Sequence, residues 1–420
     1  MYRNFKSRAC DYLSSMSRYW YFVFLGLFTQ IVSILLPPNS SISDSKAAFC
    51  NFYITKLNIF NVHIDCDSQY FLLDSQDPMR LINNQTPLQD RPAFTFVVFV
   101  ISKLLKFLGV PSGSITYLGE DGIPQNYHVL NYILFILLNL LILTVAIVIV
   151  LSVFLKIKNQ QTPLFKLSIF TAIIFTSQNP INREFFWTPH TQVFNVLVPA
   201  LLFYLAQQSL MIDKRQFFFW FCFISTTLLM YPTLSILLPV LFLRVFQSLG
   251  KIYAFSLFLT LIPKFTWPSI LNLFGGNYVD WPLVYHRRFV WILDSAESKT
   301  LLSDSSKKYI EFLNSLPLMW DIIAILMFII GLYSGIKNWR LGKWSTNSNY
   351  FYGGIVLVIY LLALGLNGAY APRFSGGVVL LLSLIVLLDV GRDKERVNWL
   401  KLPIFASLGA NFFYWFLIQS

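Results

Sequence analysis

The stretch Asp65-Cys66-Asp67-Ser68-Gln69-Tyr70 lies within a polar segment, residues 37–128, of a chain otherwise dominated by long apolar runs. Carboxylates gathered in such a segment form a functional site more often than a merely solvated loop, because charge is costly near a membrane. The fold therefore depends on how many apolar runs flank this segment, and on which side of a membrane the segment lies.

The composition predicts an integral membrane protein. Hydrophobic residues make up 56% of the 420 residues, and charged residues only 12%, against about 25% in soluble domains. The net charge of +12 comes from short basic clusters between apolar runs, a pattern that reflects orientation in a bilayer. We therefore expect no nucleic-acid partner and one transmembrane domain over residues 1–420.

The first apolar run, residues 19–36, is long enough to cross the hydrocarbon and follows a basic tail. It lacks a small-x-small cleavage site, so we interpret it as an uncleaved helix. The excess of basic residues before it predicts a cytoplasmic N-terminus and places residues 37–128 outside, as the first extracytoplasmic loop.

Residues 92–110 are apolar enough to span, but Lys103 and Lys106 interrupt them one turn apart. An interfacial helix whose lysines reach the headgroups fits this pattern. If the segment crossed, the basic cluster at residues 156–166 would lie outside, against the positive-inside rule.

The loops between the remaining apolar runs alternate between basic loops and loops with few basic residues. They predict an all-α polytopic membrane protein with about eleven transmembrane helices and two large extracytoplasmic loops, the first carrying interfacial helices. The second large loop is expected at residues 274–317, and a short outer loop at residues 179–192. The expected spans are 19–36, 129–155, 170–178, 194–207, two short helices within 217–246 that meet near Pro232, 252–273, 318–336, 351–366, 376–388 and 402–418.

This topology gathers chemically active side chains on the outer side. The paired carboxylates Asp65 and Asp67 could bind a divalent ion, Mg²⁺ or Mn²⁺, or act as a base and an orienting group. Cys66 could also pair with Cys50. The other residues that could line one outer cavity are Tyr70, Arg91, Arg183, Glu184, His190, His286, Arg287, Arg288 and Arg373.

Several cations are candidates for contact with an anion. Asp90 suits a helix N-cap and Pro92 a first helical turn, which leaves Arg91 for anion contact. Arg287 and Arg288 lie beside aromatic residues in the second large loop, where one could meet a phosphate. Two further candidates are Lys264, between two prolines, and Arg373, in a short outer turn.

The arrangement resembles the GT-C superfamily, the polytopic glycosyltransferases that use polyprenyl-phosphate sugar donors. The likeness is to protein O-mannosyltransferases, oligosaccharyltransferases and the bacterial aminoarabinose transferase. It rests on one helix, a loop opening with Asp65, Asp67 and Tyr70, and then Arg91-Pro92 before the segment ending Lys106-Phe107-Leu108-Gly109. Trp187 to Gln192 and Arg373-Phe374 are weaker matches.

The resemblance implies that a carboxylate of the first loop is the catalytic base, Asp67 by its spacing to Tyr70, or Asp65. Relatives carry Asp-Glu where this chain has Asp67-Ser68, so the choice and the metal dependence both stay open. Arg91, Lys264, Arg287, Arg288 and Arg373 would hold the donor phosphate. Tyr70, Glu184, His190 and His286 would line the substrate cavity.

The expected function is therefore transfer of a sugar from a polyprenyl-phosphate donor to a lipid, glycan or protein acceptor on the extracytoplasmic face. The alternatives are an O-antigen-type polymerase or ligase, a non-catalytic protein of the same fold, and a transporter. The expected location is the bacterial inner membrane, or the endoplasmic reticulum membrane in a eukaryote.

Overall fold

The computed structural model describes residues 19–32, 53–57, 60–64, 66–83, 86–118, 124–156, 162–207, 212–280, 290–314, 318–340, 349–368, 372–392 and 398–417. Helices dominate these residues. Of the residues singled out above, Cys50, Asp65, His286, Arg287 and Arg288 lie outside the described ranges.

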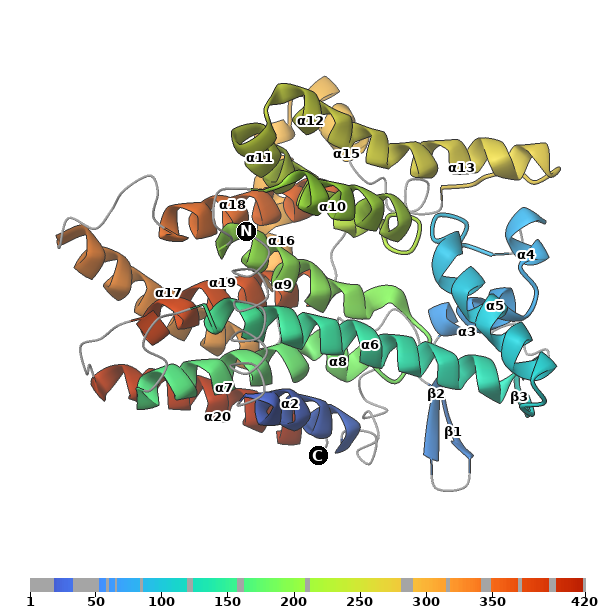
Figure 1. Ribbon diagram of the computed structural model, residues 1–420, viewed down its shortest axis with the longest axis horizontal. Helices are drawn as coiled ribbons and strands as arrows, with labels where there is room; N and C mark the ends of the chain where they lie inside the picture. The colour runs from blue at the N-terminus through green and yellow to red at the C-terminus, as the bar shows by residue number, and fades with distance from the viewer. Residues whose placement is uncertain are drawn as a thin grey trace, which may run out of the picture.

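The body of the protein is a bundle of helices that run side by side (Figure 1). Its members are α2 (Trp20–Val32), α6 (Val129–Phe154), α7 (Pro163–Ser177), α9 (Phe194–Gln207), α19 (Pro372–Arg392) and α20 (Lys401–Leu417). Helix α19 packs against α7 and α9, and α6 packs against α9. Both α9 and α19 are apolar on almost every face and buried along nearly their whole length, as expected of helices enclosed by other helices.

Further helices of the bundle surround this body. They are α10 (Lys214–Thr227), α11 (Leu237–Leu249), α12 (Lys251–Ser256), α13 (Ile262–Leu273), α17 (Leu318–Arg340) and α18 (Asn349–Asn367), with the 3₁₀ segments η4 (Pro232–Ile236), η5 (Leu257–Leu261) and η6 (Asn398–Leu400). In the described part of the chain, five helical stretches are long and apolar enough to cross a membrane: Val129–Phe154, Pro232–Leu249, Lys251–Leu273, Trp320–Lys337 and Phe374–Arg392. The chain thus has the helices of a membrane protein, whereas the total of about eleven spans stays a prediction.

The first polar segment folds at one end of the bundle (Figure 1). It contains α3 (Cys66–Gln76), α4 (Met79–Ile82) and α5 (Pro92–Phe107). It also forms two antiparallel hairpins, β1 (Tyr53–Leu57) with β2 (Phe60–Ile64) and β3 (Ile115–Leu118) with β4 (Pro124–Tyr127). The all-α prediction omitted these strands, which are short and lie in loops.

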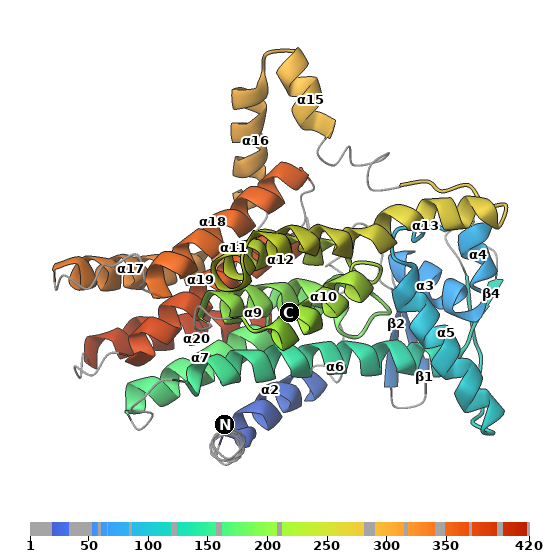
Figure 2. The same ribbon diagram turned by 45° about the horizontal axis from the view of Figure 1, so that its top comes forward.

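Helix α5 lies obliquely across the end of α6, as both views show (Figures 1 and 2). One face, with Phe94 and Val98, is buried, while the opposite face exposes Phe96, Val100 and Leu104. Pro92 occupies the first turn, as expected. The placement of α5 on a membrane surface stays a prediction.

Two other segments depart from a regular transmembrane helix or from an exposed loop. The run from α10 to α11 breaks between Thr227 and Pro232, where the proline breaker was expected. Residues 179–192, predicted as a short outer loop, instead form α8 (Pro180–Phe185) and the 3₁₀ helix η3 (Thr191–Val193) and are largely buried. Backbone carbonyl groups of this buried segment accept hydrogen bonds from polar side chains of α6. Asn139 Nδ2 donates to the carbonyl of Phe186 at 2.9 Å, and the Tyr132 hydroxyl donates to the carbonyl of Trp187 at 2.7 Å.

The second polar segment contains α15 (Val290–Glu297) and α16 (Leu301–Asn314), which project from the bundle (Figure 2). Trp291 attaches them to α18, because its indole Nε1 donates to the carbonyl of Leu366 at 3.0 Å. Gly368 allows this contact. Its φ is +71°, and a Cβ there would lie 2.6 Å from the indole ring.

Candidate functional site

Asp67 and His190 meet at the bundle end that carries the first polar segment. Asp67 lies in the first turn of α3, and its side chain is 50% exposed. Nε2 of His190 lies 3.1 Å from Oδ2 of Asp67. The ring of His190 is itself buried, with the rings of Phe71 and Phe185 against it at centroid distances of 5.4 and 5.0 Å.

The hydrogen bonds of His190 determine which nitrogen carries the proton. Nδ1 accepts the backbone N–H of Gln192 at 3.2 Å, so that nitrogen is unprotonated in this arrangement. The proton therefore lies on Nε2, which donates to the carboxylate of Asp67. A neutral histidine thus orients an exposed carboxylate.

Arg91 forms the second part of the site. It precedes α5, and its Nε lies 3.2 Å from Oδ1 of the buried Asp90. Its Nη1 donates to the hydroxyl of Thr191 at 3.1 Å. His190 contacts Asp67 and the next residue contacts Arg91, and the negative charge of Asp67 contributes to the raised pKa of Arg91, so the two groups lie near each other at one end of the bundle.

Asp90 does not play the role predicted for it. The N-cap position of α5 is held by Arg91, without a side-chain cap, and the Asp90 carboxylate pairs with the guanidinium instead. Ion pairing at the buried end of the loop therefore replaces helix capping as the reason for an acid at this position.

Lys264 of α13 completes a group of cations. Its Nζ donates to the backbone carbonyl of Asp90 at 2.9 Å. One turn further on, Trp267 Nε1 donates to the carbonyl of Gln89 at 2.7 Å. The sequence leaves two explanations for this lysine, contact with the headgroups at the outer interface or a position facing a polar cavity; the structure gives it a polar contact with the chain itself.

Gln89 joins the two polar segments. Its buried amide donates to the carbonyls of Leu81, at 2.6 Å, and Asn277, at 3.3 Å. Its Oε1 accepts the backbone N–H of Val279 at 2.9 Å. The chain after α13 is thereby fastened beside Asp90 and Arg91.

Tyr231 extends the site into the bundle. Its hydroxyl donates to Oδ1 of Asn195 at 2.7 Å, and Asn195 Nδ2 donates to Oε1 of Gln192 at 2.7 Å. All three side chains are buried. This network lies directly behind His190 and Thr191.

The electrostatics of the site favour a permanent charge on Arg91. Burial opposes that charge, but Asp90, Tyr231 and Asp67 outweigh it and raise the pKa of Arg91. Arg91 is therefore cationic at every physiological pH.

The structure brings together Asp67, Arg91, His190 and Lys264 of the residues predicted for the site. Tyr70 lies in α3 one turn after Asp67, half-buried and packed on the core. Glu184 is in α8 and Arg373 in the first turn of α19, but the described part of the structure does not include their side chains. Asp65, His286, Arg287 and Arg288 lie outside the described residues.

The sequence did not single out Thr191, Gln192, Asn195 or Tyr231 as site residues. Tyr231 directly precedes Pro232, where the sequence predicts only a break between two helices. The available signal was a run of polar residues at the start of an apolar helix, since buried amides between apolar residues need partners.

The predicted metal site depends on the carboxylates that could act as ligands. Asp67 supplies one described carboxylate, and its second candidate partner, Asp65, is not described. Among the described residues, no group of three His, Cys, Asp or Glu side chains could hold a metal ion. A divalent ion at Asp65 and Asp67 therefore stays a prediction.

Comparison with known proteins gives no family assignment. No protein-family model matches the chain, and neither a curated protein nor a solved structure gives a significant match.

Proposed function

We propose that the chain is an integral-membrane glycosyltransferase that moves a sugar from a polyprenyl-phosphate donor to a glycan, lipid or protein acceptor. One observation carries the proposal: a half-exposed carboxylate, held by a buried neutral histidine, lies at the same bundle end as Arg91, which pairs with Asp90, and Lys264, which contacts the carbonyl of Asp90. A proton acceptor next to fixed positive charge is what this transfer requires.

In the proposed reaction, a hydroxyl or amine of the acceptor attacks the anomeric carbon of the donor. The bond between that carbon and the phosphate oxygen breaks, and the phosphate leaves with the electron pair. Asp67 accepts the acceptor's proton. Arg91 and Lys264 stabilise the negative charge that grows on the phosphate. Arg287, Arg288 and Arg373 are further candidates for this contact.

His190 acts through Asp67. Its Nε2 proton fixes one carboxylate oxygen, Oδ2, and so holds the plane of the carboxylate. Positioning of this kind contributes to catalysis because the reacting groups must be aligned before the transition state. Tyr70, Glu184 and His286 would line the space that the substrates occupy.

The proposal includes the membrane arrangement. About eleven helices would cross the bilayer, with the N-terminus in the cytoplasm and Asp67 on the opposite side. Helix α5 would lie in the interface, supported by its exposed apolar face and its two lysines. The bacterial inner membrane is the proposed location, or the endoplasmic reticulum in a eukaryotic host. Asp65 and Asp67 could together hold Mg²⁺ or Mn²⁺.

The test uses the full chain in liposomes with a panel of synthetic polyprenyl-phosphate hexoses and pentoses, and release of polyprenyl phosphate is measured. Asp67→Asn should lower the rate by at least about a hundredfold, since the amide keeps the size but cannot accept a proton. Asp77→Asn, an exposed acid beyond the end of α3, is the matched control and should retain the rate. Full activity of an Asp65→Asn/Asp67→Asn double variant would end the catalytic assignment.

A carrier of lipid-linked sugars is the second candidate, favoured by the buried network of Gln192, Asn195 and Tyr231 next to a broken helix. In that case, the same liposomes would move the intact donor between leaflets without releasing polyprenyl phosphate. Transfer without translocation supports the first candidate.

A further inference from the structure

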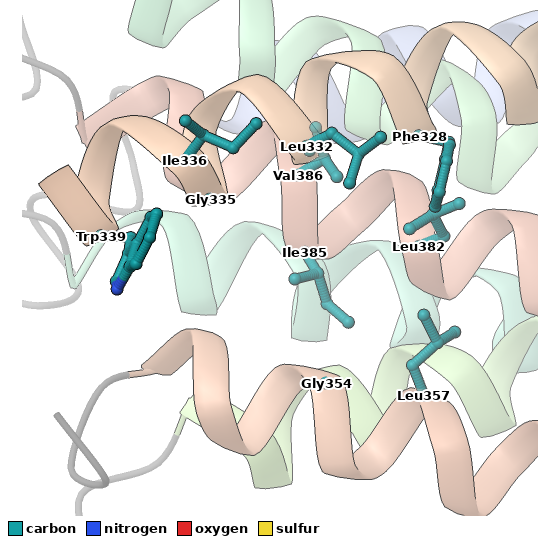
Figure 3. A pocket seen from close by; sticks show the side chains of 11 residues that line it. Phe328, Leu332, Gly335, Ile336, Trp339, Gly354, Leu357, Leu382, Ile385 and Val386 are labelled. Atoms are coloured by element: carbon teal, nitrogen blue, oxygen red, sulfur yellow. The ribbon is translucent and has the colours of Figure 1, made fainter. Parts of the chain in front are cut away.

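A cavity lies in the half of the bundle away from Asp67. Helices α17 and α18 both pack against α19 and flank a cavity of about 550 Å³. Figure 3 shows α17 along one wall, α18 along the other and α19 between them. Its volume falls within the range of about 300–1,000 Å³ that is typical of small-ligand sites.

The lining of this cavity is apolar, and three glycines widen it. Gly331 and Gly335 lie one turn apart on α17, and Gly354 faces them from α18. A Cβ at Gly335 or Gly354 would meet no atom within 4 Å, so the space beside these glycines is open.

The cavity also opens to the surroundings of the bundle. Leu332 and Ile336 line it, and both are about half exposed. In a bilayer these side chains would face the acyl chains directly. The opening therefore admits a ligand from the lipid and not from water.

Positive charge lies at one end of the cavity. Trp339, the last lining residue of α17, is 69% exposed. The last turn of α17 holds Lys337 and Arg340. Arg340 follows Ile336 by four residues and therefore continues the lining face of the helix. A tryptophan followed by basic residues is typical of the cytoplasmic membrane interface.

Asp389 at the end of α19 offsets only part of this positive charge. Asp389 follows Val386 by one turn, and its carboxylate accepts the hydroxyl of Ser334. Arg392, three residues later, donates to the amide oxygen of Gln207 at 3.1 Å. The described last turns of α17 and α19 thus carry three basic residues against one acid.

We propose that this cavity binds one acyl chain of an anionic phospholipid from the cytoplasmic leaflet, with the phosphate of the headgroup at Arg340 and Lys337. Apolar walls open to lipid select a chain, and the basic end selects an anionic headgroup. The inference rests on the membrane arrangement and is independent of the chemistry at Asp67.

Trp339 supplies the readout, because bromine atoms on an acyl chain quench a nearby indole. The probes are phosphatidylglycerol and phosphatidylcholine with brominated chains, added to the full-length protein in detergent. The difference between the wild type and Trp339→Phe gives the quenching of Trp339 itself. We expect phosphatidylglycerol to half-saturate this quenching at a concentration at least about fivefold below phosphatidylcholine, the factor expected from one basic residue at the headgroup.

Two kinds of variant test the binding of the acyl chain and the binding of the headgroup separately. Gly335→Leu and Gly354→Leu, from opposite walls, should fill the cavity and abolish the quenching. Gly409→Leu on α20 is the matched control, since its Cβ is equally unobstructed but lies outside the cavity. Arg340→Gln should reduce the preference for phosphatidylglycerol about fivefold. Equal quenching by the two lipids, or quenching that persists in both glycine variants, would overturn the proposal.

Discussion

The ring of His190 connects a backbone amide to a catalytic candidate: Nδ1 lies 3.2 Å from the nitrogen of Gln192, and Nε2 lies 3.1 Å from Oδ2 of Asp67. We expect His190→Ala to lower kcat of the proposed transfer by about tenfold or more with a smaller change in KM, because the carboxylate loses its orientation. The acid limb of the pH–rate profile should move to higher pH, since the ionised carboxylate loses a hydrogen-bond donor.

His190→Gln supplies the control for this variant. The amide of glutamine can donate to Asp67, so it should restore part of kcat and return the acid limb toward its wild-type position. A merely structural histidine would change the amount of folded protein without moving the pH profile, and that outcome would remove the assigned role.

A second prediction concerns the ion pair of Arg91 with Asp90. The two side chains are only 15% and 3% exposed, so removal of one partner leaves a buried charge without compensation. Arg91→Gln should destabilise the fold by about 3–5 kcal/mol, seen as a lower unfolding temperature in detergent. The double variant Asp90→Asn/Arg91→Gln should recover most of this loss yet remain inactive in transfer. Equal stability of the single and double variants would mean that the pair is not coupled.

The third prediction is a pH dependence of stability. Burial raises the pKa of Asp74 from 3.8 to about 6, although Thr86 and Arg80 oppose the shift by hydrogen bonding and charge. Between these values the folded protein binds more protons than the unfolded chain, so its stability falls as pH rises from about 4 to about 6. A shift of about two pKa units corresponds to about 3 kcal/mol.

Asp74→Asn should remove this part of the pH dependence. The measurement is the unfolding temperature of both proteins across pH 4–7, and the wild type should lose more stability over the window. Glu311→Gln, at an exposed acid of α16 away from Asp74, is the control and should follow the wild type. Parallel curves for Asp74→Asn and the wild type would contradict the assignment.

Sequence patterns predicted some of this fold because apolar length and proline breaks act locally. The interruption at Tyr231-Pro232 and the helix beginning at Pro92 followed from these rules. The two hairpins did not, because short strands in a loop are stabilised by pairing rather than by periodicity. The burial of residues 179–192 also escaped prediction, since it depends on Tyr132 and Asn139 from a distant part of the chain.

The candidate site shows the same division. Asp67, Arg91, His190 and Lys264 stood out because charged or ionisable groups are rare in this chain. Asn195 and Tyr231 did not, because their partners are set by packing of α9 against the broken helix. Asp90 was misassigned as a cap because local rules treat the residue before a helix in isolation.

A fourth prediction tests the junction between the two polar segments. A Cβ at Gly276 would lie 2.6 Å from the backbone oxygen of Ile82, and backbone cannot move aside as a flexible side chain can. Gly276→Ala should therefore push residues 276–280 away from Gln89 and cost about 1–3 kcal/mol. The rate of transfer should fall as well, because Gln89, which precedes Asp90 and Arg91, loses its hydrogen bonds to Asn277 and Val279. Gly409→Ala, at an unobstructed glycine outside the cavity, should not lower stability or rate; equal losses in the two variants would refute the close contact.

The last prediction concerns orientation in the membrane. Position 67 and exposed Lys103 lie at the bundle end with the first polar segment, whereas Lys214 follows α9 on the opposite side of the bundle and Arg340 ends α17. In a background without the native cysteines, a membrane-impermeant maleimide should label cysteines at 67 and 103 on intact cells. Cysteines at 214 and 340 should react only after permeabilisation, because the basic clusters around them favour the cytoplasm. Labelling of 67 and 214 from the same side would invalidate the topology. Labelling of 67 but not 103 from outside would mean that α5 crosses the bilayer, which would remove the interfacial helix from the proposed site.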